Sequence, residues 1–141
     1  MQHSLSSYLT GLTNMASSMS KNIGPSFIDA DCMNKKSFKE EFAKYYEISL
    51  DLVDLEEDNK SLEQLFDIWL GKNDKNLVDS LLYWIRLEMG KDVKVYKIKN
   101  DRLLDALSRC SGGISMFYNV EDIYFVSFDK YRVCFSMGNN E

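Results

Sequence analysis

The sequence predicts an α+β fold, in which N-terminal helices pack on a small, mostly antiparallel C-terminal sheet. Two observations predict this class. Up to residue 90, apolar residues recur at three- and four-residue spacing, which is the period of one helical face. From residue 91 onward, alternation with a period of two and many β-branched and aromatic residues indicate strands. The 141 residues are expected to form one domain, mainly helical over 1–90 and mainly strands with one helix over 91–141.

The first predicted helix covers residues 4–21. Its apolar residues share one helical face: Leu5, Tyr8, Leu9, Leu12, Met15, Ala16 and Met19. The opposite face is mostly Ser and Thr, which favour helix interiors only weakly, so the stability of this helix has to come from packing. Residues 22–34 contain Gly24-Pro25 and are expected to form a connector.

Three further helices are predicted before residue 91. Ser37 followed by Glu40 forms a capping-box pattern that begins the second helix. Where it ends is ambiguous, because residues 48–55 fit both a strand and a helix, and we favour helix. Ser61 with Gln64 repeats the capping pattern for a third helix that ends at Gly71, and a fourth runs from Asp74 to Gly90.

The remainder of the chain predicts the sheet. Lysines alternate with Val93 and Val95 over residues 91–99, a pattern typical of a half-exposed edge strand. A helix begins at Asp101, and residues 114–137 are expected to form three strands, the last two joined near Asp129-Lys130. Both faces of the segment 123–128 are apolar, so we expect both faces of the sheet to be covered.

No motif for catalysis, metal binding or phosphate binding is visible. His3 is the single histidine and lies at the N-terminus, where a general base has no orienting partner. Cys32, Cys110 and Cys134 form no close pair, which argues against disulfides and zinc sites and for a reducing compartment. No apolar run is long enough for a membrane span. We therefore expect no cofactor, no enzymatic activity and a cytoplasmic location.

Negative charge is concentrated between residues 45 and 70. The stretch contains eight acidic residues and one basic residue, Lys60, so its net charge is −7. The rest of the chain sums to +2, which gives the net charge of −5. The acids are Glu47, Asp51, Asp54, Glu56, Glu57, Asp58, Glu63 and Asp67. Such a stretch repels a phosphate backbone and attracts a basic protein, which argues against nucleic-acid binding.

Two interpretations of this stretch stay open. It can be a solvated surface that only aids solubility. It can also be a docking surface, where charge accelerates encounter and aromatic anchors supply affinity. The candidate partner-binding residues are Asp51, Asp54, Glu56, Glu57, Asp58, Tyr45, Tyr46 and Tyr124.

The leading hypothesis is a non-enzymatic protein that neutralises a basic partner, as bacterial immunity proteins and antitoxins do with nuclease toxins. One alternative is an escort or regulatory protein of a secretion system or phage, with its contact made by the apolar sheet face that carries Tyr124. Another is a small enzyme that uses two carboxylates on a nucleotide or sugar. The oligomeric state is left open.

Overall fold

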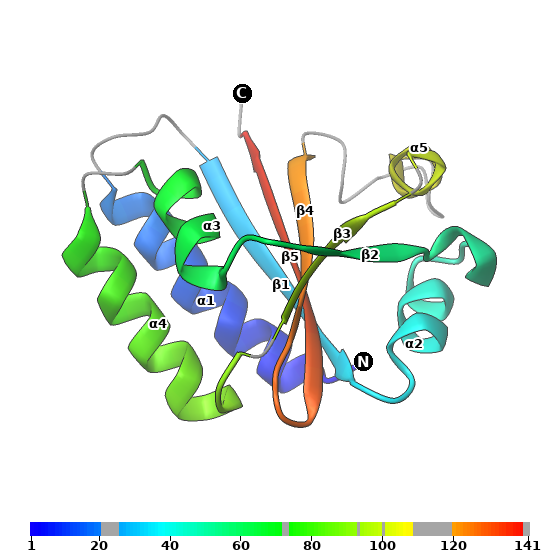
Figure 1. Ribbon diagram of the computed structural model, residues 1–141, viewed down its shortest axis with the longest axis horizontal. Helices are drawn as coiled ribbons and strands as arrows, with labels where there is room; N and C mark the ends of the chain where they lie inside the picture. Colours follow the sequence, from blue (N-terminus) through cyan, green and yellow to red (C-terminus); the bar gives the residue numbers. More distant parts are fainter. Residues whose placement is uncertain (21–25, 72–73, 93, 100, 109–119, 140–141) are drawn as a thin grey trace.

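The computed structural model describes residues 1–20, 26–71, 74–92, 94–99, 101–108 and 120–139, which form five α-helices, one 3-10 helix and a five-stranded sheet (Figure 1). The strands lie in the order β1-β5-β4-β3-β2, and every neighbouring pair is antiparallel. In chain order the elements are α1 (His3–Met19), β1 (Ser26–Asn34), α2 (Phe38–Tyr45), η1 (Leu50–Leu52), β2 (Leu55–Asp58), α3 (Leu62–Trp69), α4 (Lys75–Met89), β3 (Lys94–Ile98), α5 (Arg102–Ser108), β4 (Val120–Ser127) and β5 (Tyr131–Asn139). The predicted α+β class is confirmed, and the helices lie mostly in the N-terminal part.

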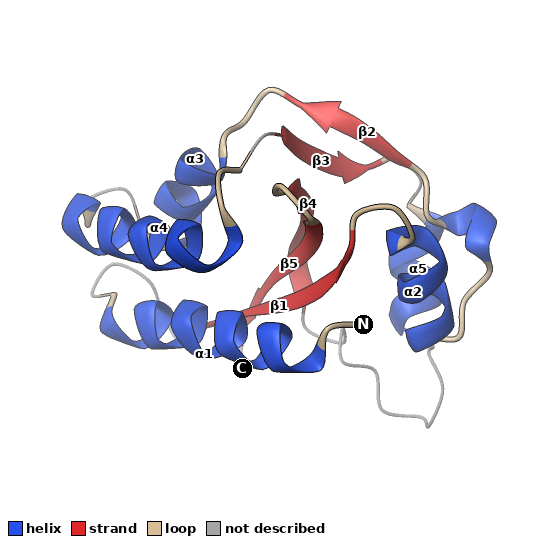
Figure 2. Cartoon of the chain, turned by 90° about the horizontal axis from the view of Figure 1, so that it is seen from below, coloured by secondary structure: helices blue, strands red, loops and turns tan. Residues whose placement is uncertain are grey.

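The sheet separates two groups of helices (Figure 2). α1, α3 and α4 lie on one side, and α2, η1 and α5 lie on the other. Each side has its own hydrophobic core. The first core includes Phe66 and Phe135, and the second includes Phe42 and Phe125. The sheet is therefore buried on both faces.

Strands β4 and β5 supply both cores because their residues alternate between the two faces. Ile123 and Phe125 belong to the second core, whereas Val126 and Phe128 belong to the first. The expectation that both faces are covered is confirmed. The predicted turn between the last two strands is also confirmed, because the Phe128 N–H donates to the Tyr131 carbonyl at 2.8 Å across it.

The outer edge of β1 is closed by polar side chains of α1 rather than by another strand. The Thr10 hydroxyl accepts from the Ala30 N–H at 3.0 Å and donates to the Ala30 carbonyl at 3.0 Å. The Asn14 amide accepts from the Ile28 N–H at 3.1 Å and donates to the Ile28 carbonyl at 2.9 Å. Each side chain therefore replaces the pair of hydrogen bonds that a neighbouring strand residue would make.

This ladder continues to the start of the helix. The Ser6 hydroxyl accepts from the Cys32 N–H at 2.8 Å, and the Gln2 N–H donates to the Cys32 carbonyl at 2.8 Å. Four helical residues rise about 6 Å and two strand residues about 6.6 Å, so every fourth residue of α1 meets every second residue of β1. The Ser- and Thr-rich face of α1 is thus explained by the strand that it covers.

Two features of this region differ from expectation. The predicted connector 22–34 contains β1 from residue 26, and the residues before it lie outside the described part. The second difference concerns Tyr8, Met15 and Met19, which share the predicted apolar face of the first helix but are 41%, 56% and 59% exposed. The polar side of α1 takes the inward position at the edge of β1, and this turns the three side chains outward.

The chain between α2 and α3 also differs from expectation. The Ser37 hydroxyl donates to the Glu41 carboxylate at 2.6 Å, so the expected capping box with Glu40 does not form. The helix favoured over residues 48–55 is wrong beyond the single 3-10 turn of η1, because Leu55 begins β2. Pairing of β2 with β3 overrides the local helical spacing.

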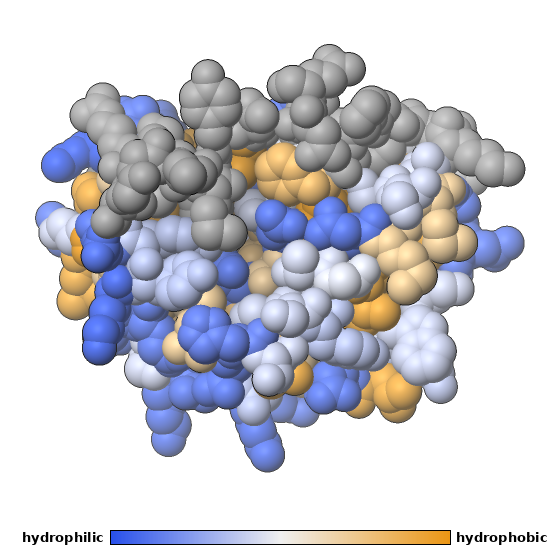
Figure 3. Space-filling view, turned by 180° about the vertical axis from the view of Figure 1, so that it is seen from behind, coloured by the Kyte–Doolittle hydropathy of each residue, from blue (hydrophilic) through white to orange (hydrophobic). Residues whose placement is uncertain are grey.

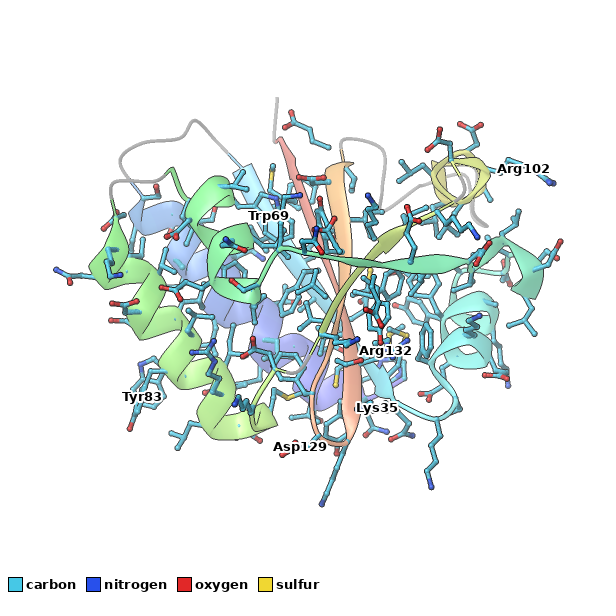
Figure 4. All side chains as sticks on the ribbon, viewed as in Figure 1. Lys35, Trp69, Tyr83, Arg102, Asp129 and Arg132 are labelled. Carbon is cyan, nitrogen blue, oxygen red and sulfur yellow. The ribbon has the colours of Figure 1, made fainter. Side chains whose placement is uncertain are left out.

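The predictions for α3 and α4 are confirmed. The Ser61 hydroxyl accepts from the Gln64 N–H at 3.1 Å, and the Gln64 side chain accepts from the Ser61 N–H at 2.8 Å. Gly71 and Gly90 follow the two helices with φ of 76° and 82°. The indole N–H of Trp69, on α3, donates to the carboxylate of Asp122 on β4 at 3.1 Å, which holds the end of α3 against the sheet (Figure 4).

Strand β3 and helix α5 lie where the sequence predicts a strand and a helix. Of the three strands expected over residues 114–137, the last two are β4 and β5, and the first falls on residues outside the described part. No helix in the described ranges is both long and apolar enough to cross a membrane.

The edge ladder yields a prediction for Asn14. Asn14→Leu keeps the approximate size of the side chain but removes both bonds to Ile28 on a partly buried edge. Because a buried polar group without a partner costs about 1–3 kcal/mol, we expect the free energy of unfolding in urea to fall by that amount. Asn76→Leu, the same exchange at an exposed position of α4, should change it by less than about 0.5 kcal/mol. Equal effects of the two variants would contradict the role of the ladder.

Candidate functional site

The fold distributes the acidic stretch over the segment around η1, strand β2 and helix α3. β2 pairs with β3, which places Glu56 opposite Lys97 and Glu57 opposite Tyr96. The Lys94 ammonium lies 2.6 Å from the Glu57 carboxylate, and Lys97 lies 3.7 Å from Glu56. The hydrogen bond to Glu57 raises the pKa of Lys94. These carboxylates therefore already have cationic partners within the chain.

The same pairing corrects the interpretation of the β3 lysines. β3 lies between β4 and β2, so the expectation of an edge strand is wrong, and the edge is β2. The lysines provide cross-strand partners for the acids of β2, a kind of pair that stabilises antiparallel strands modestly.

Asp58 has a structural role at the end of β2. Its side chain is 7% exposed and accepts from the backbone N–H of Lys60 at 2.8 Å. The ammonium groups of Lys60 and Lys97 lie 3.5 and 4.0 Å from its two carboxylate oxygens. Asp58 thus fixes the turn that leads from β2 into α3.

The three candidate tyrosines lie in different environments. Tyr45 is 44% exposed, whereas Tyr46 is 4% exposed and packs on Phe42 with ring centroids 4.8 Å apart. Tyr124 is half-buried on the opposite face of the sheet, where its ring lies 6.1 Å from that of Trp69. Only Tyr45 of the three presents its ring openly to solvent.

The remaining candidates, Asp51 and Asp54, lie in or next to η1, and Glu47 and Leu50, which the sequence did not single out, are exposed in the same segment. We call this surface the acidic end and define it as Tyr45, Glu47, Leu50, Asp51 and Asp54. Every member is exposed, and Tyr45 and Leu50 leave 44% and 48% of their surface open. The acidic end therefore combines three carboxylates with two large apolar side chains.

Local backbone geometry positions this surface. Helix α2 ends at Tyr45, and Glu47 takes a φ of 53°, which reverses the chain so that the Ile48 N–H donates to the Ala43 carbonyl at 2.9 Å. Val53, 2% exposed, then anchors the chain that follows η1 in the second core.

The charge of the acidic end is well defined at Asp51. The Ser49 hydroxyl donates to the Asp51 carboxylate, and this bond lowers the pKa of that carboxyl, with a smaller contribution from Arg102. Arg102 begins α5 at the same end of the molecule (Figure 4). Asp51 is consequently ionised throughout the physiological range.

Asp29 and Asp31, two residues apart on β1, are engaged by different elements. The Asn14 amide donates to Asp29 at 2.9 Å, and the Tyr46 hydroxyl donates to Asp31. Burial raises the pKa of the Asp31 carboxyl, although the bond from Tyr46 opposes this effect. In the described part of the chain, no group of three or more His, Cys, Asp or Glu side chains could hold a metal ion.

The cysteine thiols are placed for packing rather than for nucleophilic chemistry. Cys32 lies in β1, not in the expected loop, and Cys134 lies in β5; both are buried and free. Burial raises the pKa of Cys32 to about 12 and raises that of Cys134 as well. A thiolate, the reactive form, is therefore disfavoured at both positions. Cys110 falls outside the described residues.

An apolar groove between α1 and α4 was missed by the sequence reasoning. It has a volume of about 690 Å³ and is lined by Leu12, Met15, Ala16, Met19, Asp74, Asn76, Leu77, Ser80, Leu81 and Trp84. Trp84 is 49% exposed, and Tyr83 and Leu87 beside it on α4 are 60% and 65% exposed. The sequence contained one indication of the groove: α1 has more apolar residues than can be buried in the core. Its inward face is partly occupied by the polar side chains that bond to β1, so Met15 and Met19 stay exposed.

Arg132 is a second residue that the sequence did not single out. Its guanidinium carbon lies 4.1 and 4.4 Å from the ring centroids of Phe38 and Tyr96, and its Nε donates to the Ser127 hydroxyl at 3.0 Å (Figure 4). Partial burial lowers its pKa without discharging it. The stack covers the rim of the second core, and we assign it a packing role.

Comparisons with models of protein families, with curated proteins and with solved structures found no match for this chain. Arguments about function therefore rest on the geometry of the surfaces described above.

The hydrogen-bonded pair of half-buried Asp31 and buried Tyr46 predicts a dependence of stability on pH. Because the pKa of Asp31 is raised above 3.8 in the folded protein, the folded state holds this proton more tightly than the unfolded state does. Stability should therefore fall as pH rises above 3.8 through the folded pKa. Asp31→Asn removes this titration, so we expect the variant to gain stability relative to the native chain over that interval and to keep the gain at pH 7.

Chemical denaturation at pH values from 3 to 7 tests this prediction. Tyr46→Phe serves as the companion variant, because loss of the hydroxyl removes a bond that lowers the pKa of Asp31, and the fall in stability with pH should extend to higher pH. A stability difference between Asp31→Asn and the native chain that does not vary with pH would contradict the burial effect.

Proposed function

We propose that this chain is a non-enzymatic protein-binding protein that neutralises or inhibits a partner with a basic surface. The observation that supports this most is the acidic end, a short segment of chain in which exposed Tyr45 and Leu50 are interspersed with exposed Glu47, Asp51 and Asp54. Exposed carboxylates in the same short segment as large exposed apolar side chains have the composition of a docking surface.

The two kinds of side chain have separate tasks in this proposal. The carboxylates attract a basic partner over distances of about the Debye length, 8 Å at physiological salt, and fix its orientation. Tyr45 and Leu50 supply the contact area that becomes buried, where most binding energy resides. If the partner acts on nucleic acid, these carboxylates take the place of substrate phosphates and block access to its binding surface.

We revise the set of docking residues for this proposal. Glu56, Glu57 and Asp58 have intramolecular partners, and Tyr46 is buried, so we retain Tyr45, Asp51 and Asp54 and add Glu47 and Leu50. Asp51 and Asp54 are the two carboxylates of the predicted set that remain in the proposed docking surface.

The alternatives have less support. A contact through Tyr124 would use a side chain already half-buried against Trp69. Carboxylate catalysis would need two acids that share a free site, whereas Asp29 and Asp31 are each bound by a different side chain. A cytoplasmic location is part of the proposal, supported by the two free, buried cysteines.

Charge reversal at the acidic end tests the proposal. Partners are captured from the host on the native chain, and the stoichiometric one is purified and titrated by calorimetry. We expect it to be a basic protein whose affinity falls with salt. Asp51→Lys/Asp54→Lys should weaken binding by tenfold or more, roughly the loss of one or two close charge pairs.

Glu63→Lys/Asp67→Lys is the matched control. It makes the same change of charge within the same acidic stretch of sequence, but on α3 at the other end of the molecule. Affinity should stay within about threefold of the native value, because only long-range attraction is altered. Equal losses in the two variants, or binding that ignores salt, would show that the acidic end is not the interface.

A further inference from the structure

Helix α1 is an uncharged surface element in a charged protein. Its 17 residues include no Asp, Glu, Lys or Arg, although such residues make up 28% of the chain and the net charge is −5. Figure 3 looks onto the side of the molecule that carries α1, where pale, weakly polar residues and orange hydrophobic ones occupy much of the surface. Solubility alone favours charge on such a face, so its absence requires a physical reason.

Five of the exposed residues of α1 form a regular stripe. Ser4, Tyr8, Gly11, Met15 and Ser18 are all exposed and are separated by steps of four, three, four and three residues. This is the spacing of the seam along which two helices pack. The stripe is nearly symmetric about Gly11, with one large side chain and then one serine on each side.

Gly11 lies at the middle of the helix, and no contact with the described part of the chain requires a glycine there. It is not among the glycines with positive φ, and an added Cβ would meet no described atom within 4 Å. A glycine in a helix interior costs about 1 kcal/mol relative to alanine. Neither the backbone conformation nor crowding inside the chain requires glycine at position 11. The lack of a side chain there does allow another helix to approach α1 closely from outside.

The apolar groove between α1 and α4 continues this surface. Met15 belongs to both the stripe and the groove, and Met19 and Trp84 extend the exposed apolar area, with 59% and 49% of their surfaces open. Among the described residues that line the groove, Asp74 alone carries a charge. Stripe and groove together form one continuous, nearly uncharged face.

We propose that this face binds a second copy of the chain. The two α1 helices pack antiparallel around a twofold axis and cross at Gly11. Tyr8 then lies against the partner's Met15, and Ser4 lies opposite the partner's Ser18. Because residue i meets j and j meets i, the stripe is complementary to itself.

The distribution of charge favours a second copy of the chain as the partner of the α1 face. Two chains of net charge −5 repel each other wherever acidic surfaces meet. α1 brings no carboxylate to the contact, so this is a face on which an acidic chain can meet itself without opposing like charges. The first turn of α1 borders the acidic end, because the His3 ring lies 6.1 Å from that of Tyr45, whereas Gly11 and Met15 lie further along the helix.

Sedimentation equilibrium and light scattering test the proposal. The native chain should have twice the mass of the 16.4 kDa monomer, with little dependence on salt. Gly11→Ala should weaken the dimer by about tenfold or more, because the added methyl groups meet at the crossing, although the same change favours the helix itself. Met15→Glu should dissociate it, whereas Ile68→Glu, the same kind of change at an exposed residue of α3, should not.

A cysteine at the crossing point tests the orientation. Gly11→Cys should form an intermolecular disulfide under mild oxidation, because only residues on the axis meet their own copies, and Ser18→Cys should not. A native chain of 16.4 kDa at every concentration overturns the proposal. A dimer that survives both Gly11→Ala and Met15→Glu also overturns it, since it would use another surface.

Discussion

The structure depends on the hydrogen bonds that pair the backbone groups at the outer edge of β1. Ser6, Thr10 and Asn14 of α1 take the place of a sixth strand and pair with the backbone of Cys32, Ala30 and Ile28. This arrangement fixes α1 in both position and rotation, because a shift by one residue would unpair the whole edge. The fixed rotation turns Leu9 and Ala16 into the first core, seats α4 against the same helix and leaves Tyr8, Met15 and Met19 outside.

Features encoded within a few residues could be predicted from the sequence. The capping box of Ser61 and Gln64, the turn at Gly71 and the two-faced alternation of β4 each depend on neighbours along the chain. β1 and β2 were missed because their partners are remote: Ser26 pairs with Asn139 and Leu55 with Ile98. In β1 the alternation of Ile28, Ala30 and Cys32 with two aspartates was present but was obscured by Gly24-Pro25 just before it.

The candidate site illustrates the difference between charge in a sequence and charge in space. Eight acids within 26 residues suggested one surface, yet β2 carries three of them to the lysines of β3. Asp51 and Asp54 are exposed, because η1 keeps this segment outside the sheet, and their role in binding stays a prediction. The groove could not be predicted, because α1 and α4 are far apart in the sequence and become neighbours only in the folded structure.

The position of β5 also has a consequence for biosynthesis. β5 lies between β1 and β4 in the sheet, although it follows every other described element in the chain. On the ribosome, α1 and β1 can close one edge early, but the inner edge of β1 stays without a partner until residues 131–139 emerge. An open strand edge recruits other strands, so the nascent chain is most prone to misassembly during this interval. Slower translation of the last strand would lengthen the time for which the inner edge of β1 is unpaired. A chaperone that binds this edge would protect it from other strands during that time.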